Sequence, residues 1–137
     1  MKRGPEHGQI TVLTVGFLLI LGLLTVVVIN ASAAFLERRE LLNLADRAAL
    51  TAADGLARDQ LYRQGVDSEV PIDVAEAQRL AASVVPTDAA LDVRVEDGTV
   101  HVRLERTYGL PITPPGWRDS ARIGAESTAQ LQVAQRP

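Results

Sequence analysis

The hydrophobic pattern takes three forms along the chain, and the first is an unbroken apolar segment. Residues 10–29 read ITVLTVGFLLILGLLTVVVI and contain no charge and no proline. A helix of this length rises about 30 Å, the hydrocarbon thickness of a bilayer. Because backbone groups in lipid must find partners within their own segment, even the β-branched run at its end is expected to be helical. The pattern predicts a transmembrane helix.

Two other interpretations of this segment stay open. Lys2 and Arg3 precede it, and the sequence Ala-Ser-Ala at 31–33 has the A-x-A form, as in a cleaved signal peptide. The segment is, however, longer than the roughly 7–15 residues of a usual h-region. A buried core helix is disfavoured, because the segment is apolar on all sides and the chain after it is too short to enclose it.

The second form is a one-sided helical pattern from Asn30 to Gln64. No Gly or Pro interrupts residues 30–54, and Gly65 is suited to end the helix. Apolar residues recur there at spacings of three and four, at Leu41, Ala45, Ala48, Ala52 and Leu56. The same helix is therefore expected to continue past the apolar segment, and from Gly8 it would be about 85 Å long.

Small residues are concentrated on this part of the helix, and they are the candidate helix-packing and partner residues: Ala45, Ala48, Ala49, Ala52 and Ala53. Alanines four residues apart let another backbone approach closely. Two interpretations remain open, since the contact chemistry is the same in both. The alanines either face this protein's own sheet or form a helix–helix seam with other subunits.

A second, short helix is predicted after a linker at 66–72. Asp73 is suited to cap it, and Glu76 follows three residues later, which resembles a capping box. Its apolar face comprises Ala77, Leu80, Ala81, Val84 and Val85. Pro86 is expected to end it.

The third form is strict alternation, which predicts a β-hairpin. Leu91, Val93 and Val95 alternate with charged residues, and Val100, Val102 and Leu104 do the same after Asp97-Gly98. A two-residue Asp-Gly loop between alternating runs indicates a type I′ turn. In this register Val95 pairs with Val100, Val93 with Val102 and Leu91 with Leu104, and Asp92 lies opposite Arg103.

A loop over residues 108–122 is expected next, followed by a third strand at 123–133 with one small-residue face. The loop is rich in Pro and Gly and holds the only tryptophan, Trp117. Long loops in small domains are often functional, so Tyr108 and Trp117 form a candidate contact loop. The alternative is that both rings simply cover the core. Together the elements predict an α+β fold: a long N-terminal helix packs with a short helix on a small three-stranded antiparallel sheet.

Composition removes several classes of function. After Asn30 the chain holds twelve arginines and sixteen acidic residues, so it has no basic face for nucleic acid. It has no cysteine, and the spacings of zinc, calcium and phosphate-binding loops are absent. His7 and His101 lie on opposite sides of the apolar segment and cannot share a site. We therefore expect no catalytic residue, metal, cofactor or small-molecule substrate.

Residues 7–57 resemble the N-terminal region of TadE/TadG-like proteins of the tight-adherence (Tad, or Flp) pilus assembly system. The resemblance rests on Gly8-Gln9 before the apolar segment, on small residues after it, and on LADRAALTAA at 44–53. It implies a pilin-like bacterial protein with its N-terminus in the cytoplasm and its domain outside. The chain departs from pilin precursors in one respect. A cut after Gly4 or Gly8 would place Gln9 or Leu13 at the fifth mature position, where pilins carry Glu.

These observations predict a membrane-anchored, pilin-like accessory subunit that assists assembly or stability of a surface pilus. The expected divisions are a cytoplasmic tail at 1–9, a transmembrane helix at 10–29, its extension at 30–64, and an extracytoplasmic α+β domain at 65–137. The expected location is the bacterial cytoplasmic membrane. The expected partners are the lipid bilayer and other pilin-like subunits or Tad assembly-complex membrane proteins. The alternative function is a secreted or anchored, non-catalytic binding module of the cell envelope.

Overall fold

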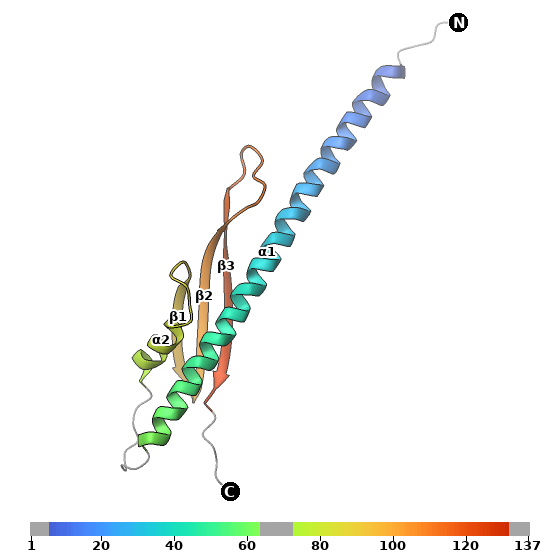
Figure 1. Ribbon diagram of the computed structural model, residues 1–137. Helices are drawn as coiled ribbons and strands as arrows, with labels where there is room; N and C mark the ends of the chain where they lie inside the picture. The colour runs from blue at the N-terminus through green and yellow to red at the C-terminus, as the bar shows by residue number, and fades with distance from the viewer. Residues whose placement is uncertain (1–5, 64–72, 132–137) are drawn as a thin grey trace, which may run out of the picture.

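The computed structural model describes residues 6–63 and 73–131 and confirms the α+β prediction. The elements are, in chain order, α1 (Glu6–Arg63), α2 (Val74–Ala82), β1 (Ala90–Glu96), β2 (Thr99–Gly109) and β3 (Ser120–Gln130). The strands form one antiparallel sheet in the order β1-β2-β3. Figure 1 shows α1 as one long rod, with the sheet and α2 against its C-terminal half and its N-terminal half projecting alone.

Some predictions concern parts of the chain outside the described residues. These are the tail before Glu6, the helix end at Gly65, the linker at 66–72, and the end of the third strand after Leu131. Helix α1 begins at Glu6, two residues before the predicted start at Gly8.

Two threonines of the apolar segment, Thr14 and Thr25, bond to the backbone of their own helix. Thr14 Oγ1 donates to Ile10 O at 2.8 Å, and Thr25 Oγ1 donates to Leu21 O at 2.9 Å. Each hydroxyl thereby has a partner one turn back and needs none from outside the helix. The helix then continues through Gly55 without interruption.

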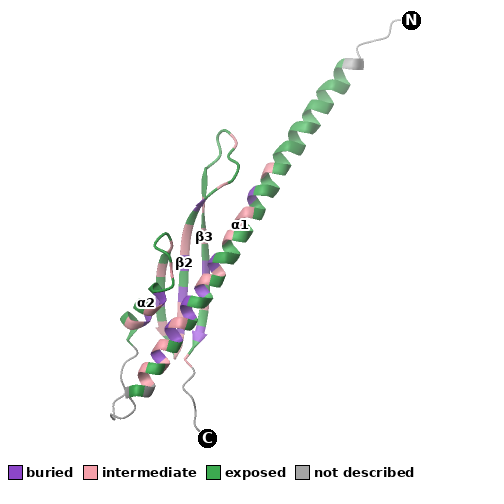
Figure 2. Cartoon of the chain, viewed as in Figure 1, coloured by how far each residue is buried: buried purple, intermediate pink, exposed green. Residues whose placement is uncertain are grey.

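Burial along α1 changes character at Asn30. Residues 8–29 are exposed on all sides apart from Val26, which is half-buried. After that point one stripe of the helix is buried, as Figure 2 shows. The stripe comprises Asn30, Leu41, Ala45, Ala48, Ala49, Ala52, Ala53 and Leu56. The predicted one-sided face from Leu41 to Leu56 is thus the face that packs on the sheet and α2.

The hairpin has the predicted register. Val95 pairs with Val100, Val93 with Val102, Leu91 with Leu104, and Asp92 with Arg103. Asp97 has φ 49° and Gly98 has φ 70°, as the two central positions of a type I′ turn require. Val100, Val102 and Leu104 point from this hairpin into the core and are fully buried.

The third strand presents small side chains to α1, as predicted. Ala125 and Ala129 are buried, and Ser127 Oγ donates a hydrogen bond to the carboxylate of Asp46 on α1. The predicted bounds of this strand, 123–133, are wrong, because β3 runs from Ser120 to Gln130 and its pairing with β2 continues to Gly109 opposite Ser120. The irregular segment is therefore residues 110–119, shorter than the predicted 108–122.

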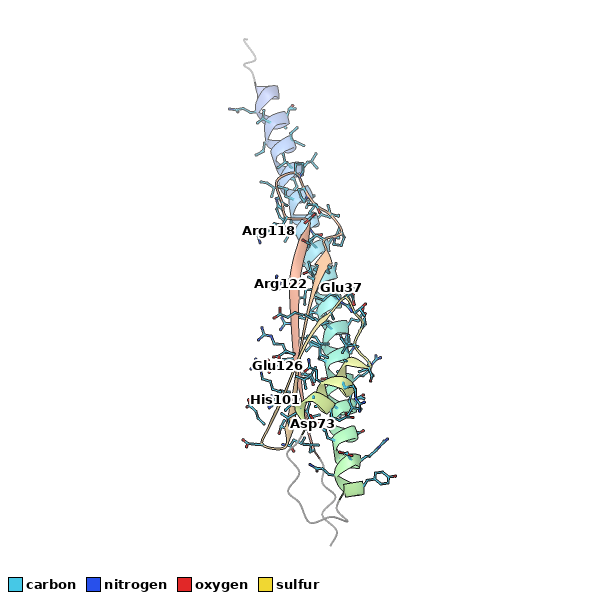
Figure 3. All side chains as sticks on the ribbon, turned by 90° about the vertical axis from the view of Figure 1, so that its left-hand side faces the viewer. Glu37, Asp73, His101, Arg118, Arg122 and Glu126 are labelled. Carbon is cyan, nitrogen blue, oxygen red and sulfur yellow. The ribbon has the colours of Figure 1, made fainter. Side chains whose placement is uncertain are left out.

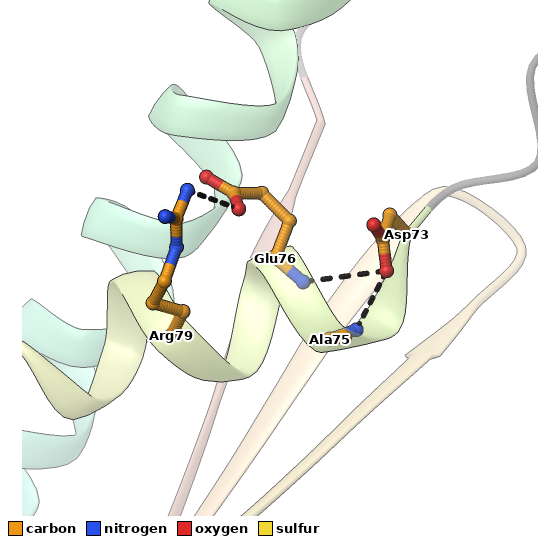
Figure 4. Close-up of polar contacts among 4 residues, drawn as sticks. All are labelled: Asp73, Ala75, Glu76 and Arg79. Atoms are coloured by element: carbon orange, nitrogen blue, oxygen red, sulfur yellow. Dashed lines mark hydrogen bonds and ion pairs between the residues drawn. The ribbon is translucent and has the colours of Figure 1, made fainter.

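Helix α2 is capped as predicted but is shorter. Asp73 Oδ1 accepts hydrogen bonds from Ala75 N at 2.9 Å and Glu76 N at 3.4 Å, while the Glu76 carboxylate pairs with Arg79 (Figure 4). The helix ends at Ala82, where Ser83 Oγ donates to the Leu80 carbonyl at 2.6 Å, so Val84 and Val85 lie beyond it. Leu80 packs directly against α1 at Gly55, which has no side chain. A Cβ atom on Gly55 would overlap Leu80 Cδ1.

The buried alanines of α1 predict a measurable cost of overpacking. Ala49 is fully buried, so Ala49→Leu must displace its neighbours and should lower the free energy of unfolding by about 1–3 kcal/mol. Ala82→Leu, on an exposed residue of α2, is the matched control and should change it little. Denaturant unfolding of the full chain in detergent micelles measures both. Equal stabilities of the two variants would contradict the packing described.

Candidate functional site

The N-terminal half of α1 exposes a continuous apolar surface. Apart from the half-buried Val26, its large side chains range from 40% exposed at Ile29 to 75% at Leu13. Removing one such side chain from water is worth about 1.5–3 kcal/mol, so the segment strongly favours an apolar surrounding. Among the described helices, α1 alone is long and apolar enough to cross a membrane. The structure therefore fits a single-pass anchor.

The five candidate alanines lie in the core of this chain. Ala45, Ala48, Ala49 and Ala52 have no exposed surface, and Ala53 has 4%. This burial agrees with the first of the two interpretations, in which the alanines face the protein's own sheet. Elsewhere on this half of α1, Phe35, Leu36 and Leu50 are exposed.

Asn30 joins the apolar segment to the β2–β3 loop. Its side chain is 7% exposed although its neighbours on both sides are apolar. Asn30 Nδ2 donates to Ile112 O at 2.7 Å, and Asn30 Oδ1 accepts from Ile112 N at 3.2 Å. The carboxamide thus pairs with both backbone groups of one loop residue. These two bonds place the loop beside the end of the apolar segment.

The β2–β3 loop, residues 110–119, is an ordered turn closed at its base. Leu110 N donates to Asp119 O at 2.8 Å, and Trp117 N donates to Pro114 O at 3.1 Å. Gly116 has φ 87°, the left-handed conformation that a type II turn needs at its third position after a proline. The backbone of the loop is thereby held in one shape.

The two aromatic candidates have different environments. Tyr108 is buried at the end of β2, and its hydroxyl donates to Asn30 O at 3.4 Å. Trp117 is 49% exposed on the loop. Tyr108 therefore holds the loop to α1, and Trp117 is the residue that a contacting surface would meet.

A charged cluster lies under the same end of the sheet. Arg106 is 14% exposed and points from β2 toward α1 and the turn before β1. Its Nε lies 3.2 Å from Asp88 Oδ2, and its Nη1 lies 3.8 Å from both Glu37 Oε2 and Glu40 Oε1. Arg106 Nη2 also donates a hydrogen bond to Asp88 Oδ1 at 3.4 Å, whereas the buried Nε has no aligned acceptor. They fix the sheet against α1 just below Asn30.

The outer face of the sheet carries mixed charges. Figure 3 shows His101, Arg122 and Glu126 on the side away from α1. Arg103 pairs with Glu105 at 3.1 Å, and Arg94 pairs with Asp92 at 3.1 Å. Within residues 6–63 and 73–131, no three His, Cys, Asp or Glu residues are arranged to hold a metal ion.

Comparison with known proteins finds a family match in the N-terminal part of the chain. Residues 8–55 match the model of the Tad family of Flp pilus-assembly, TadE/G-like proteins, which confirms the resemblance seen in the sequence. The match covers the apolar segment and the alanine-rich stretch and ends before α2. Searches of the curated proteins and of the solved structures found no match. The match supports a role related to pilus assembly.

Because the Asn30 side chain bonds both backbone groups of Ile112, we expect the β2–β3 loop to open locally when this side chain loses its polar atoms. Asn30→Leu leaves the amide and carbonyl of Ile112 unpaired, a loss of about 1–3 kcal/mol in local stability. Hydrogen exchange at the Ile112 amide in micelles should therefore accelerate by about 10- to 100-fold. Asn43→Leu, the same change at an exposed position of α1, should leave that rate unchanged. Undiminished protection in Asn30→Leu would contradict the pairing.

Proposed function

We propose that this protein is a membrane-anchored, pilin-like accessory subunit that assists assembly or stability of a Tad/Flp-type surface pilus. The family match over residues 8–55 supports the pilus system. The exposed apolar half of α1 supports the anchor. The same match is to a pilus-assembly family, which supports a structural rather than a catalytic role.

The observation that carries the anchored role is the position of Asn30. A signal peptidase acting at the A-x-A sequence would cut after Ala33 and remove Asn30 from the mature protein. The Ile112 backbone and the Tyr108 hydroxyl would then lose their partners on α1. Because the domain uses residues on the N-terminal side of that cut, we propose that the apolar helix stays attached to it.

The family resemblance suggests the orientation and the divisions of the chain. We propose a cytoplasmic tail at 1–9, a spanning helix at 10–29, its extension at 30–64, and an extracytoplasmic domain at 65–137. The proposed partners are the bilayer and other pilin-like or Tad assembly-complex membrane proteins. The exposed apolar residues of α1 beyond the membrane, Phe35, Leu36 and Leu50, are suited to such a protein partner.

The alternative, a non-catalytic envelope binding module, has one observation in its favour. Trp117 is half exposed on an ordered loop, as a recognition residue often is. The loop is nevertheless bonded to the end of the apolar helix. A secreted module that had lost this helix would lack the loop's hydrogen-bond partner.

A genetic test separates the two functions. Deleting the gene in the native bacterium should reduce the number of surface pili, and the full chain should restore them. A variant whose residues 1–33 are replaced by a cleavable signal peptide should be secreted but should not restore pili. Intact mass of the native protein should include residues 10–29, in the membrane fraction. Normal piliation without the gene would refute the accessory role, and a soluble species beginning at Ala34 would refute the anchor.

The proposed orientation can be measured with one added thiol. The natural chain has no cysteine, so Thr99→Cys introduces a single thiol at the hairpin turn. It should react with a membrane-impermeant maleimide in cells whose outer barrier is permeable to the reagent. Glu6→Cys, on the other side of the apolar segment, should react only after lysis. The reverse pattern would place the domain in the cytoplasm.

A further inference from the structure

We propose that the β2–β3 loop, residues 110–119, is a second membrane contact, which rests in the interfacial layer of the bilayer with Trp117 among the lipid headgroups. This inference rests on the proposed function in one respect, namely that α1 spans a membrane. It does not depend on which side of the membrane holds the domain.

The position of the loop follows from the Asn30 junction. Asn30 directly follows the apolar segment, and both backbone groups of Ile112 are bonded to its side chain. One turn earlier, Val26 is half-buried, while every other residue from 8 to 29 is exposed. Figure 2 shows the loop alongside the place where α1 changes from exposed on all sides to buried on one stripe. The loop thus lies level with the end of the spanning segment.

The outer surface of α1 stays apolar beyond this level. Phe35 and Leu36 are each 64% exposed, and the first charge after the apolar segment is Glu37. A bilayer that covers these two side chains extends past Asn30. A polar carboxamide at that depth needs partners within the protein, and the loop supplies them. The same geometry places the loop's own outer surface against lipid.

The composition of the loop suits the interfacial layer. Pro111, Pro114 and Pro115 have no N–H group, and the N–H groups of Leu110, Ile112 and Trp117 are bonded within the protein. Six of the ten loop residues therefore present no unbonded backbone N–H group to be desolvated. The half-exposed Trp117 and the partly exposed Ile112 supply apolar surface, and tryptophan is enriched where membranes meet water.

Arg118, next to Trp117 in the loop, adds an exposed cation (Figure 3). A long cationic side chain can extend from an apolar surface to phosphate oxygens. The chemistry that this loop recognises is therefore a lipid surface, with an apolar layer below and phosphate groups above.

The single tryptophan allows a direct test on the full chain. The protein is reconstituted in phosphatidylcholine vesicles that contain lipids brominated either near the headgroup or near the end of the acyl chain. We expect the fluorescence of Trp117 to be quenched, and more strongly by the bromines near the headgroup. Its emission should also lie at shorter wavelength than that of an indole in water.

Two variants in a Trp117→Phe background serve as matched controls. The indole of Phe17→Trp reports the spanning helix and should be quenched most by the deep bromines. The indole of Thr99→Trp, at the hairpin turn, should be unquenched. Circular dichroism verifies that each variant keeps its helix and sheet.

The possible outcomes separate the loop contact from the anchor. Quenching of Phe17→Trp without quenching of Trp117 would overturn the loop contact and leave the anchor intact. Absence of quenching at both positions would overturn the anchor and the loop contact together. Equal quenching at Thr99→Trp and Trp117 would mean that the whole domain lies on the bilayer, and would also overturn the assignment to this loop.

Discussion

One helix has to be stable in two surroundings, and the place where its surface changes determines the rest of the structure. N-terminal to Asn30, α1 is apolar on all sides and touches almost nothing. C-terminal to it, the same helix is apolar on one stripe and supports the whole sheet. The loop, the Arg106 cluster and the aromatic ring of Tyr108 are all gathered at this boundary. The domain thus packs on α1 from Asn30 toward the C-terminal end of the helix.

Contact between sheet and helix depends on small side chains on both sides. The alanines of α1 face Ala125, Ser127 and Ala129 of β3, so the two backbones approach closely. Among residues 6–63 and 73–131, the large and fully buried side chains are those of Leu41, Leu104, Val100 and Val102. A core this thin stabilises a domain modestly, because little apolar area is removed from water. Charge pairs and the bonds of Asn30 therefore matter more here than they would in a larger protein.

Much of this fold could be predicted from local patterns. The hairpin register followed from alternation around Asp97-Gly98, and the helix followed from spacing at Leu41 to Leu56. Asn30 and Arg106 were missed, because each looks like an ordinary polar residue until a segment about 65 to 80 residues away in the chain is placed beside it. The loop bounds were misjudged for a related reason. Tyr108 extends β2 by packing on α1, and nothing in the surrounding Pro and Gly pattern reveals that contact.

Because α1 is one continuous helix, a tilt of its apolar segment also moves the domain at its other end. From Asn30 to Arg63 the helix extends about 50 Å at 1.5 Å per residue. A spanning helix tilts by about 20° on average, which would carry the far end of this rod sideways by roughly 17 Å. No hinge within α1 absorbs that motion, since the helix is continuous through Gly55. A loop that rests on the lipid on one side would favour leaning in that direction. Small rotations inside the bilayer would then become large, directed displacements of the hairpin tip.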